Sequence, residues 1–210
     1  MTSTLPQVAE RRATDDEETG LPLVLRLEPV LHLSDDQLLA LCAINHELWI
    51  ERNAKGELLL MPPAGLETGE REVDIVGQLW TWAKRDGSGV AVGPSGGFRL
   101  PNGAIRAADA AWVRRDRWDA LAADERKRFV PLAPDFVIEL RSPSDRLRDQ
   151  QDKLAEWIAK GVRLGWLLDP EPRHVYVYRP GEPVERLDDP TELSADPLLP
   201  RFVLDLREIW

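Results

Sequence analysis

The 210 residues suffice for one domain with a sizeable hydrophobic core and are too few for two full domains. Hydrophobic residues make up 43% and charged residues 30%, no apolar run reaches membrane-spanning length, and the single cysteine excludes an internal disulfide or a cysteine-based zinc site. The net charge of −10 argues against tight, non-specific binding of nucleic acid, although a local basic groove is still compatible with it.

The first half of the chain predicts a helix, a hairpin and a second helix. Residues 1–20 are polar, lack an apolar signal core and predict a flexible extension of a cytoplasmic protein. Ser34 and Gln37 form a capping-box pattern for a helix to about Asn45. A β-rich hairpin follows over residues 48–61 around Lys55-Gly56, and a loop over 62–69 leads to a long helix over 69–84.

The second half alternates strands and helices, which predicts one α/β domain over residues 21–210. Strands are expected at 90–92, 97–100 and 110–113, then a charged helix or helical loop at 115–129. The nearly continuous apolar run at 134–140 is typical of a central strand covered on both faces. A helix over 141–161, capped by its Ser-Pro-Ser-Asp start, precedes strands at 162–169 and 174–180, and the tail at 197–210 is expected to pack back on the body.

Two carboxylates carry the chemical signal. Asp109 begins the strand at 110–113, and Glu139 interrupts the apolar strand at 134–140. A carboxylate inside a central strand is costly to bury unless it is ion-paired, hydrogen-bonded or bound to a metal. Carboxylate oxygens suit Mg²⁺ or Mn²⁺, which keep several waters and polarise phosphodiesters. The structural alternatives are a turn role for Asp109 and an ion pair of Glu139 with Arg106 or Arg141.

A phosphodiesterase site also needs a cation near the attacked phosphate. Arg141 follows Glu139 by two residues, and Lys153 lies on the next helix. Arginine stays protonated and can stabilise charge but cannot act as a base. The alternative for Lys153 is an exposed helical lysine, the commonest fate of that residue.

Several segments resemble a known family. The run DAAWV from Asp109, the runs PDFVIELRSPSD, KLAEWIAKGVRLGWLLDP and VYVYRPG, and the loop PPAGLETG resemble the bacterial putative restriction endonucleases of the Uma2 type, a branch of the PD-(D/E)XK superfamily. The resemblance covers residues 30–210. It implies a restriction-endonuclease-like core, a mixed β-sheet flanked by helices, that cleaves DNA with Mg²⁺.

The resemblance also implies roles for individual residues. Asp109 and Glu139 match the metal-binding acids, and the carbonyl of Leu140 would add a ligand. The lysine expected two residues after the glutamate is Arg141 here, and the resemblance favours Lys153 as its replacement. The superfamily often adds a carboxylate from the first core helix. Glu67, Glu70 and Glu72 compete for that role, with first-turn acids favoured by the helix dipole as the alternative.

The sequence therefore predicts a divalent-metal-dependent endonuclease acting on DNA. A homodimer is expected because duplex cleavage needs two cuts and most oligomers are two-fold symmetric. The alternative is a catalytically inactive binding or regulatory module with the same fold, which the acidic net charge and the arginine at position 141 favour.

Overall fold

The computed structural model describes residues 22–210, so the predicted extension at residues 1–20 lies outside the described residues. The chain folds around a six-stranded sheet, with a five-stranded sheet and a two-stranded sheet beside it. The order of the large sheet is β11-β10-β9-β8-β7-β4, and only β8 and β9 run parallel. Its strands are β4 (Gly89–Val92), β7 (Ala110–Arg114), β8 (Phe136–Leu140), β9 (Leu164–Asp169), β10 (His174–Tyr178) and β11 (Glu185–Asp188).

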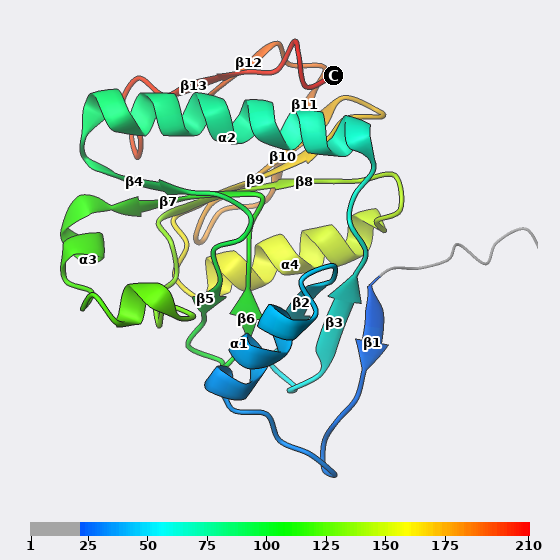
Figure 1. Cartoon of the computed structure of the whole chain (residues 1–210). Helices are drawn as coiled ribbons and strands as arrows, with labels where there is room; N and C mark the ends of the chain where they lie inside the picture. Colours follow the sequence, from blue (N-terminus) through cyan, green and yellow to red (C-terminus); the bar gives the residue numbers. More distant parts are fainter. Residues whose placement is uncertain (1–21) are drawn as a thin grey trace, which may run out of the picture.

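Two long helices cover opposite faces of the large sheet, α2 (Leu66–Asp86) on one face and α4 (Leu147–Ala159) on the other (Figure 1). Side chains alternate between the faces along each strand. Phe136 and Ile138 therefore pack with Ile75 and Leu79 of α2, whereas Val137 packs with the α4 side of the core. This alternation also directs Glu139, two residues after Val137, towards α4.

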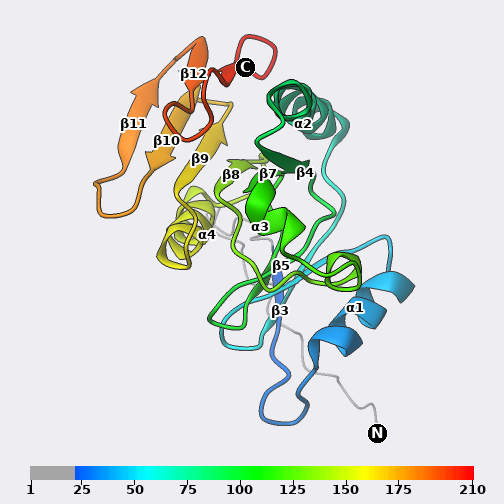
Figure 2. The ribbon, with the colours of Figure 1, turned by 90° about the vertical axis from the view of Figure 1, so that its left-hand side faces the viewer.

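The five-stranded sheet lies on the α4 side of the large sheet, next to helix α1 (Asp35–Ile44) (Figures 1 and 2). Its order is β1-β3-β2-β6-β5. The strands are β1 (Leu23–Leu25), β2 (Trp49–Arg52), β3 (Leu58–Met61), β5 (Phe98–Arg99) and β6 (Ile105–Arg106). Phe98, Leu100 and Ala104 pack against Trp157 of α4, which ties the two sheets together.

The short elements complete the chain. Helix α3 (Arg115–Asp119) and the 3₁₀ turn η1 (Glu125–Lys127) occupy the segment where a charged helix or helical loop is expected. Strands β12 (Glu192–Ser194) and β13 (Val203–Asp205) form the two-stranded sheet. The tail packs back as predicted, because Phe202, Leu206 and Ile209 are buried in the core beside α2. None of the helices within residues 22–210 has both the length and the apolar character needed to cross a bilayer.

Most predicted elements are confirmed, and three details are corrected. The capping box of Ser34 and Gln37 and the hairpin turn at Gly56 are present. However, α2 begins three residues earlier than predicted, so Glu67 lies in its first turn. The strand expected at 97–100 is present as the shorter β5, and it pairs with β6 in the small sheet, a strand that the sequence did not predict.

The third correction concerns the start of α4. The predicted Ser-Pro-Ser-Asp cap is wrong, since α4 begins at Leu147 and no side chain caps it. The Asp145 carboxylate instead accepts the Ser142 N–H at 2.9 Å, which forms a separate turn before the helix.

Candidate active site

Asp109 and Glu139 meet at one end of the large sheet. β7 and β8 are antiparallel with Ala110 opposite Ile138, and continuing this register by one residue brings Asp109 opposite Glu139. Directly opposed residues of antiparallel strands have Cβ atoms about 5 Å apart. The Leu140 N–H donates to Asp109 Oδ2 at 2.6 Å, which fixes the Asp109 carboxylate against β8. The two acids that sequence analysis singles out therefore face one another.

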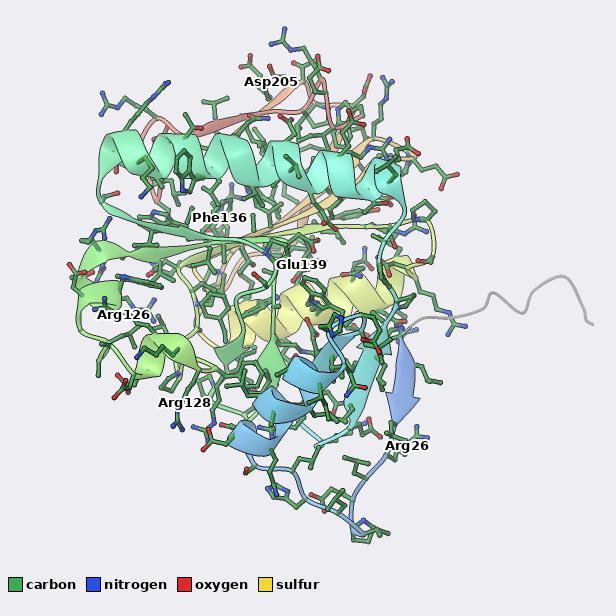
Figure 3. All side chains as sticks on the ribbon, viewed as in Figure 1. Arg26, Arg126, Arg128, Phe136, Glu139 and Asp205 are labelled. Atoms are coloured by element: carbon green, nitrogen blue, oxygen red, sulfur yellow. The ribbon has the colours of Figure 1, made fainter. Side chains whose placement is uncertain are left out.

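Glu139 is buried between the sheet and α4, with 2% of the residue exposed. In Figure 3 it lies on the α4 side of β8, whereas Phe136 of the same strand lies towards α2. Two residues one helical turn apart on α4 bind it: Lys153 Nζ lies 3.0 Å from Oε2, and the indole N–H of Trp157 donates to Oε1 at 2.8 Å. A buried carboxylate thus has one charged and one neutral partner.

Lys153 also contacts groups other than Glu139. Its ammonium lies 3.1 Å from Glu51 Oε1 on β2 and donates to the Ala107 carbonyl at 2.8 Å. The sequence left open that Lys153 is an exposed helical lysine. Its side chain is only 16% exposed and points inward. The ammonium is held by groups from β2, from the segment before β7 and from β8.

Sequence analysis missed Glu51. Only 3% of this residue is exposed, and it accepts hydrogen bonds from the Ala107 N–H at 3.1 Å and from Arg106 Nη1 at 2.9 Å. Arg106 also donates to Glu156 of α4 through Nε at 2.7 Å. The sequence offered only a weak signal for it, a charged residue inside a predicted strand that is half polar.

Arg141 is not brought to this cluster. It forms an ion pair with the buried Asp169 at 3.0 Å, and its Nε donates to the Asp145 carbonyl at 3.0 Å. Arg141 therefore neutralises a carboxylate on β9 and fixes the turn before α4.

The three glutamates of α2 differ in placement. Glu67 and Glu70 are exposed, and Glu67 pairs with Arg71 on the same helix at 2.8 Å. Glu72 is half-buried and close enough to Asp109 for that charge to raise its pKa. Of the three candidates, only Glu72 is thus electrostatically linked to the carboxylate pair.

The carboxylates resist ionisation in one another's presence. Burial, followed by the charges of Asp109 and Glu51, raises the pKa of Glu139 to about 8 despite the opposing effect of Lys153. Burial also raises the pKa of Asp109, and burial together with Asp109 raises the pKa of Glu72 to about 7. The cluster therefore holds more negative charge than its cations neutralise.

Glu51 and Lys153, in contrast, both favour their charged forms. Burial opposes the charged form of both groups, but the charges of Lys153 and Arg106 lower the pKa of Glu51. Glu139, Glu51 and Asp109 raise the pKa of Lys153 above its ordinary value. Lys153 is therefore an ammonium at neutral pH and is not available as a proton acceptor.

These residues fit a magnesium-like ion held by few protein ligands. Within residues 22–210, no three His, Cys, Asp or Glu side chains come close enough to enclose a metal ion by themselves. Two carboxylates and a main-chain carbonyl nevertheless suffice for Mg²⁺, which keeps several of its waters. The raised pKa values of Asp109 and Glu139 indicate a place where an added cation would be favourable.

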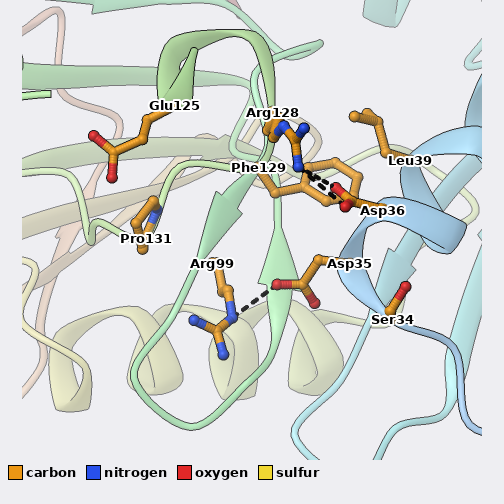
Figure 4. Close-up of a pocket in the computed structure, with 9 residues that line it drawn as sticks. All are labelled: Ser34, Asp35, Asp36, Leu39, Arg99, Glu125, Arg128, Phe129 and Pro131. Atoms are coloured by element: carbon orange, nitrogen blue, oxygen red, sulfur yellow. Dashed lines mark hydrogen bonds and ion pairs between the residues drawn. The ribbon is translucent and has the colours of Figure 1, made fainter. Parts of the chain in front are cut away.

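A hollow near the small sheet is a different feature. It has a volume of about 340 Å³ and lies between α1 and residues 125–131 (Figure 4). Two ion pairs cross it, Arg99 with Asp35 at 2.9 Å and Arg128 with Asp36 at 2.8 Å. None of its lining residues belongs to the carboxylate cluster, and its charges are mutually paired, so we assign no role to it.

Comparison with known proteins identifies the family. The family model described as Uma2, putative restriction endonuclease, matches residues 35–207, which include the whole cluster. The chain belongs to the Uma2 family. No curated protein matches it.

A solved structure supports the fold of this Uma2 chain. It resembles the crystal structure of a putative nuclease belonging to DUF820 from Anabaena variabilis, with a TM-score of 0.71 and 20% sequence identity. The match covers 84% of this chain and 97% of that one. The restriction-endonuclease-like fold expected from the sequence, a mixed sheet flanked by helices, is therefore confirmed.

Proposed function

We propose that this Uma2 protein is an endonuclease that hydrolyses phosphodiester bonds of DNA in the cytoplasm with Mg²⁺ or Mn²⁺. The observation that carries the proposal is the meeting of Asp109 and Glu139 beside the ammonium of Lys153. The sheet brings two acids together, and α4 adds a cation beside them. Such an arrangement suits a reaction in which negative charge builds up on phosphate.

The metal would be held by Asp109, Glu139 and the carbonyl of Leu140. Mg²⁺ bound there would polarise the phosphate and lower the pKa of an attacking water. Once ionised beside the metal, Glu139 would have oxygen lone pairs to spare, because a carboxylate offers about four acceptor positions and Lys153 and Trp157 use two of them.

Lys153 acts as a fixed positive charge in this proposal. Because neighbouring acids keep it protonated, it would orient the water and stabilise the negative charge of the transition state. Glu51 is a positioning residue: it binds the ammonium at 3.1 Å and is itself bound by Arg106 at 2.9 Å. Arg141, which binds Asp169, supports the start of α4 and has no part in the reaction.

Glu72 is the helix carboxylate of the proposal. Its charge is coupled to that of Asp109, whereas Glu67 and Glu70 are exposed on α2. From that place Glu72 would bind a water of the metal ion or the attacking water itself.

Cleavage assays test the proposal. Supercoiled plasmid, linear duplex and single-stranded DNA would be incubated with Mg²⁺, Mn²⁺ or a chelator. We expect metal-dependent cleavage by the wild type and by Glu185→Gln, a change on the exposed edge strand β11. Asp109→Asn and Glu139→Gln keep the side-chain shapes and should abolish cleavage. Retention of wild-type rates by either variant would remove the mechanism.

The second candidate is an inactive module with the same fold. Two observations favour it: the net charge of −10, and the engagement of Lys153 by Glu51 and Glu139. Calorimetry separates the candidates, because the nuclease should bind Mn²⁺ in a manner that depends on Asp109. An inactive module should show no such binding. In either case we propose a homodimer, whose contact surface is considered next.

A further inference from the structure

The outer face of α2 carries an apolar seam that faces away from the protein's own core. Leu66, Val73 and Trp80 are 93%, 73% and 52% exposed and are spaced seven residues apart. Glu70, Gly77 and Lys84 are also exposed and lie between and after them at alternating intervals of four and three residues. These six residues are the α2 seam. Such spacing places all of them on one side of a helix and is the spacing of helix-pairing interfaces.

The interior of the chain does not account for the seam. The inward face of α2 is formed by Ile75, Leu79 and Ala83, which pack on the large sheet. In Figure 2, where α2 is viewed nearly along its axis, β12 and the C-terminus lie on one side of it and the other side is free of described elements. Exposed single apolar residues are ordinary, but a regular row of them along a helix marks an interaction surface.

Gly77 at the middle of the seam is the more specific observation. Glycine inside a helix is about 1 kcal/mol less favourable than alanine. A Cβ atom at Gly77 would have nothing within 4 Å in this chain, and the helix there needs no special backbone conformation. No contact within the described residues therefore requires glycine at this position. Glycine there leaves room for a helix from outside to approach closely.

The charges of the seam indicate which partner and which direction. The seam carries Glu70 near its start, next to Glu67 in the first turn of α2, and Lys84 at its end, next to Arg85 in the last turn. A second α2 running parallel would place acid against acid and base against base. A second α2 running antiparallel places each acidic end against a basic end, which is favourable for both copies at once. The seam is thus complementary to itself across a two-fold axis.

We propose that two copies of this chain pair through antiparallel α2 helices. With the axis midway between Val73 and Gly77, Val73 faces the partner's Gly77, Glu70 faces the partner's Trp80, and Leu66 faces the partner's Lys84. Lys84 already lies 5.5 Å from the Trp80 ring centre in its own chain, so its ammonium is held near the partner's acidic turn. Every seam residue has a counterpart, and the valine fits the space that the glycine leaves.

A hollow beside α2 enlarges the surface available to a partner helix. It has a volume of about 490 Å³, includes Gly77, and is bordered by Phe202 and Val203. Val203 is 45% exposed. A helix seated on the seam at Gly77 would cover this edge as well. One helix pair with its borders is still smaller than a typical interface of about 800 Å² per partner, so the dimer should dissociate on dilution.

Sedimentation of the full chain over protein concentrations from about 1 to 200 μM tests the proposal. We expect a monomer–dimer equilibrium in the wild type. Trp80→Glu should leave only monomer, whereas Glu185→Gln on β11 should sediment as the wild type does. Circular dichroism of each variant verifies that it is folded, and these side chains are exposed, so loss of folding is not expected.

A charge exchange tests the direction of the helices. Glu70→Lys and Lys84→Glu should each raise the dissociation constant by more than about tenfold, because like charges then lie within one helical turn of each other across both symmetric halves of the interface. The double variant restores opposite charges and should return to within about threefold of the wild type. A wild type that is monomeric throughout overturns the proposal. So does a dimer that is indifferent to Trp80→Glu, or a double variant that is no better than the singles. Because sedimentation needs neither metal nor DNA, these outcomes are independent of the nuclease assays.

Discussion

Replacing Glu51 by glutamine tests whether this carboxylate holds Lys153 and Arg106 in place. Glu51 is almost fully buried, and its carboxylate binds two cations, Lys153 at 3.1 Å and Arg106 at 2.9 Å, together with the Ala107 N–H. Glutamine has nearly the same volume, so no cavity is created. It keeps one acceptor oxygen but presents an amide NH₂ group to cations that can only donate.

The expected loss of stability is large. Removing one partner of a buried ion pair typically costs about 3–5 kcal/mol, because the remaining charge is left without its counterion. Arg106 retains Glu156, and Lys153 retains Glu139, which places the effect at the lower end of that range, about 3 kcal/mol. For a chain of this length each kcal/mol lowers the melting temperature by about 2–4 °C, so a decrease of about 6–12 °C follows.

Thermal unfolding at pH 7 in a chelator measures this effect without metal. Glu185→Gln is the matched control, because it removes an exposed carboxylate paired with Arg179 at 3.1 Å. Exposed pairs contribute at most about 1 kcal/mol, so the control should melt within about 4 °C of the wild type. If Glu51→Gln also melts within that range, Glu51 does not hold the cations and its positioning role is refuted.

The pH dependence of the difference provides an internal check. The cations lower the pKa of Glu51 from its ordinary 4.5, so the folded state prefers the carboxylate. Stability from such a group is present above the unfolded pKa and is lost as the pH falls through the folded pKa. The gap between wild type and Glu51→Gln should therefore be full at pH 7 and shrink below about pH 4.5. A gap that is constant with pH would indicate a packing defect instead.

Three further outcomes follow from the same contacts. In the metal-free protein, Asp109→Asn should melt at a higher temperature than the wild type at pH 8, and the gain should be smaller at pH 4. The reason is that the raised pKa of Asp109 makes its charged form destabilise the fold as the pH rises. A variant that melts no higher than the wild type at either pH would contradict this. Lys153→Met should reduce metal-dependent cleavage by at least about 100-fold, whereas Lys153→Arg should retain more activity; equal rates for the two would show that the charge is not used. Arg141→Met should destabilise the fold by about 3–5 kcal/mol by leaving Asp169 unpaired, yet calorimetry should find Mn²⁺ affinity unchanged.

The sequence predicts the burial of Glu139 because the signal for it lies in its immediate neighbours. A single carboxylate stands in an apolar run, and that run is a central strand buried on both faces. Glu51 was missed because β2 is short and half polar, so its glutamate resembles an ordinary hairpin side chain. Its burial arises only when β6, more than fifty residues later, pairs with β2 through Arg52 and Ile105. Such a contact has no trace in the spacing of nearby residues.

The position of the lysine has a similar explanation. Arg141 lies two residues after Glu139, which suggested proximity, but it lies beyond the end of β8 and binds Asp169 of the neighbouring β9. Lys153 is remote in sequence and is brought in by the packing of α4. Sequence spacing within a strand is informative only while the strand continues.

Helix α4 therefore determines the geometry of the cluster. Lys153 and Trp157 are one turn apart on it, so a single rigid element sets both donors to Glu139. The helix approaches the sheet closely because β9 has glycine at position 165, where a Cβ atom would lie 2.8 Å from Leu154 Cδ1 and 3.4 Å from Val137 Cγ2. A strand residue with no part in the chemistry thus fixes the distance between the sheet, which carries the acids, and the helix, which carries the cation.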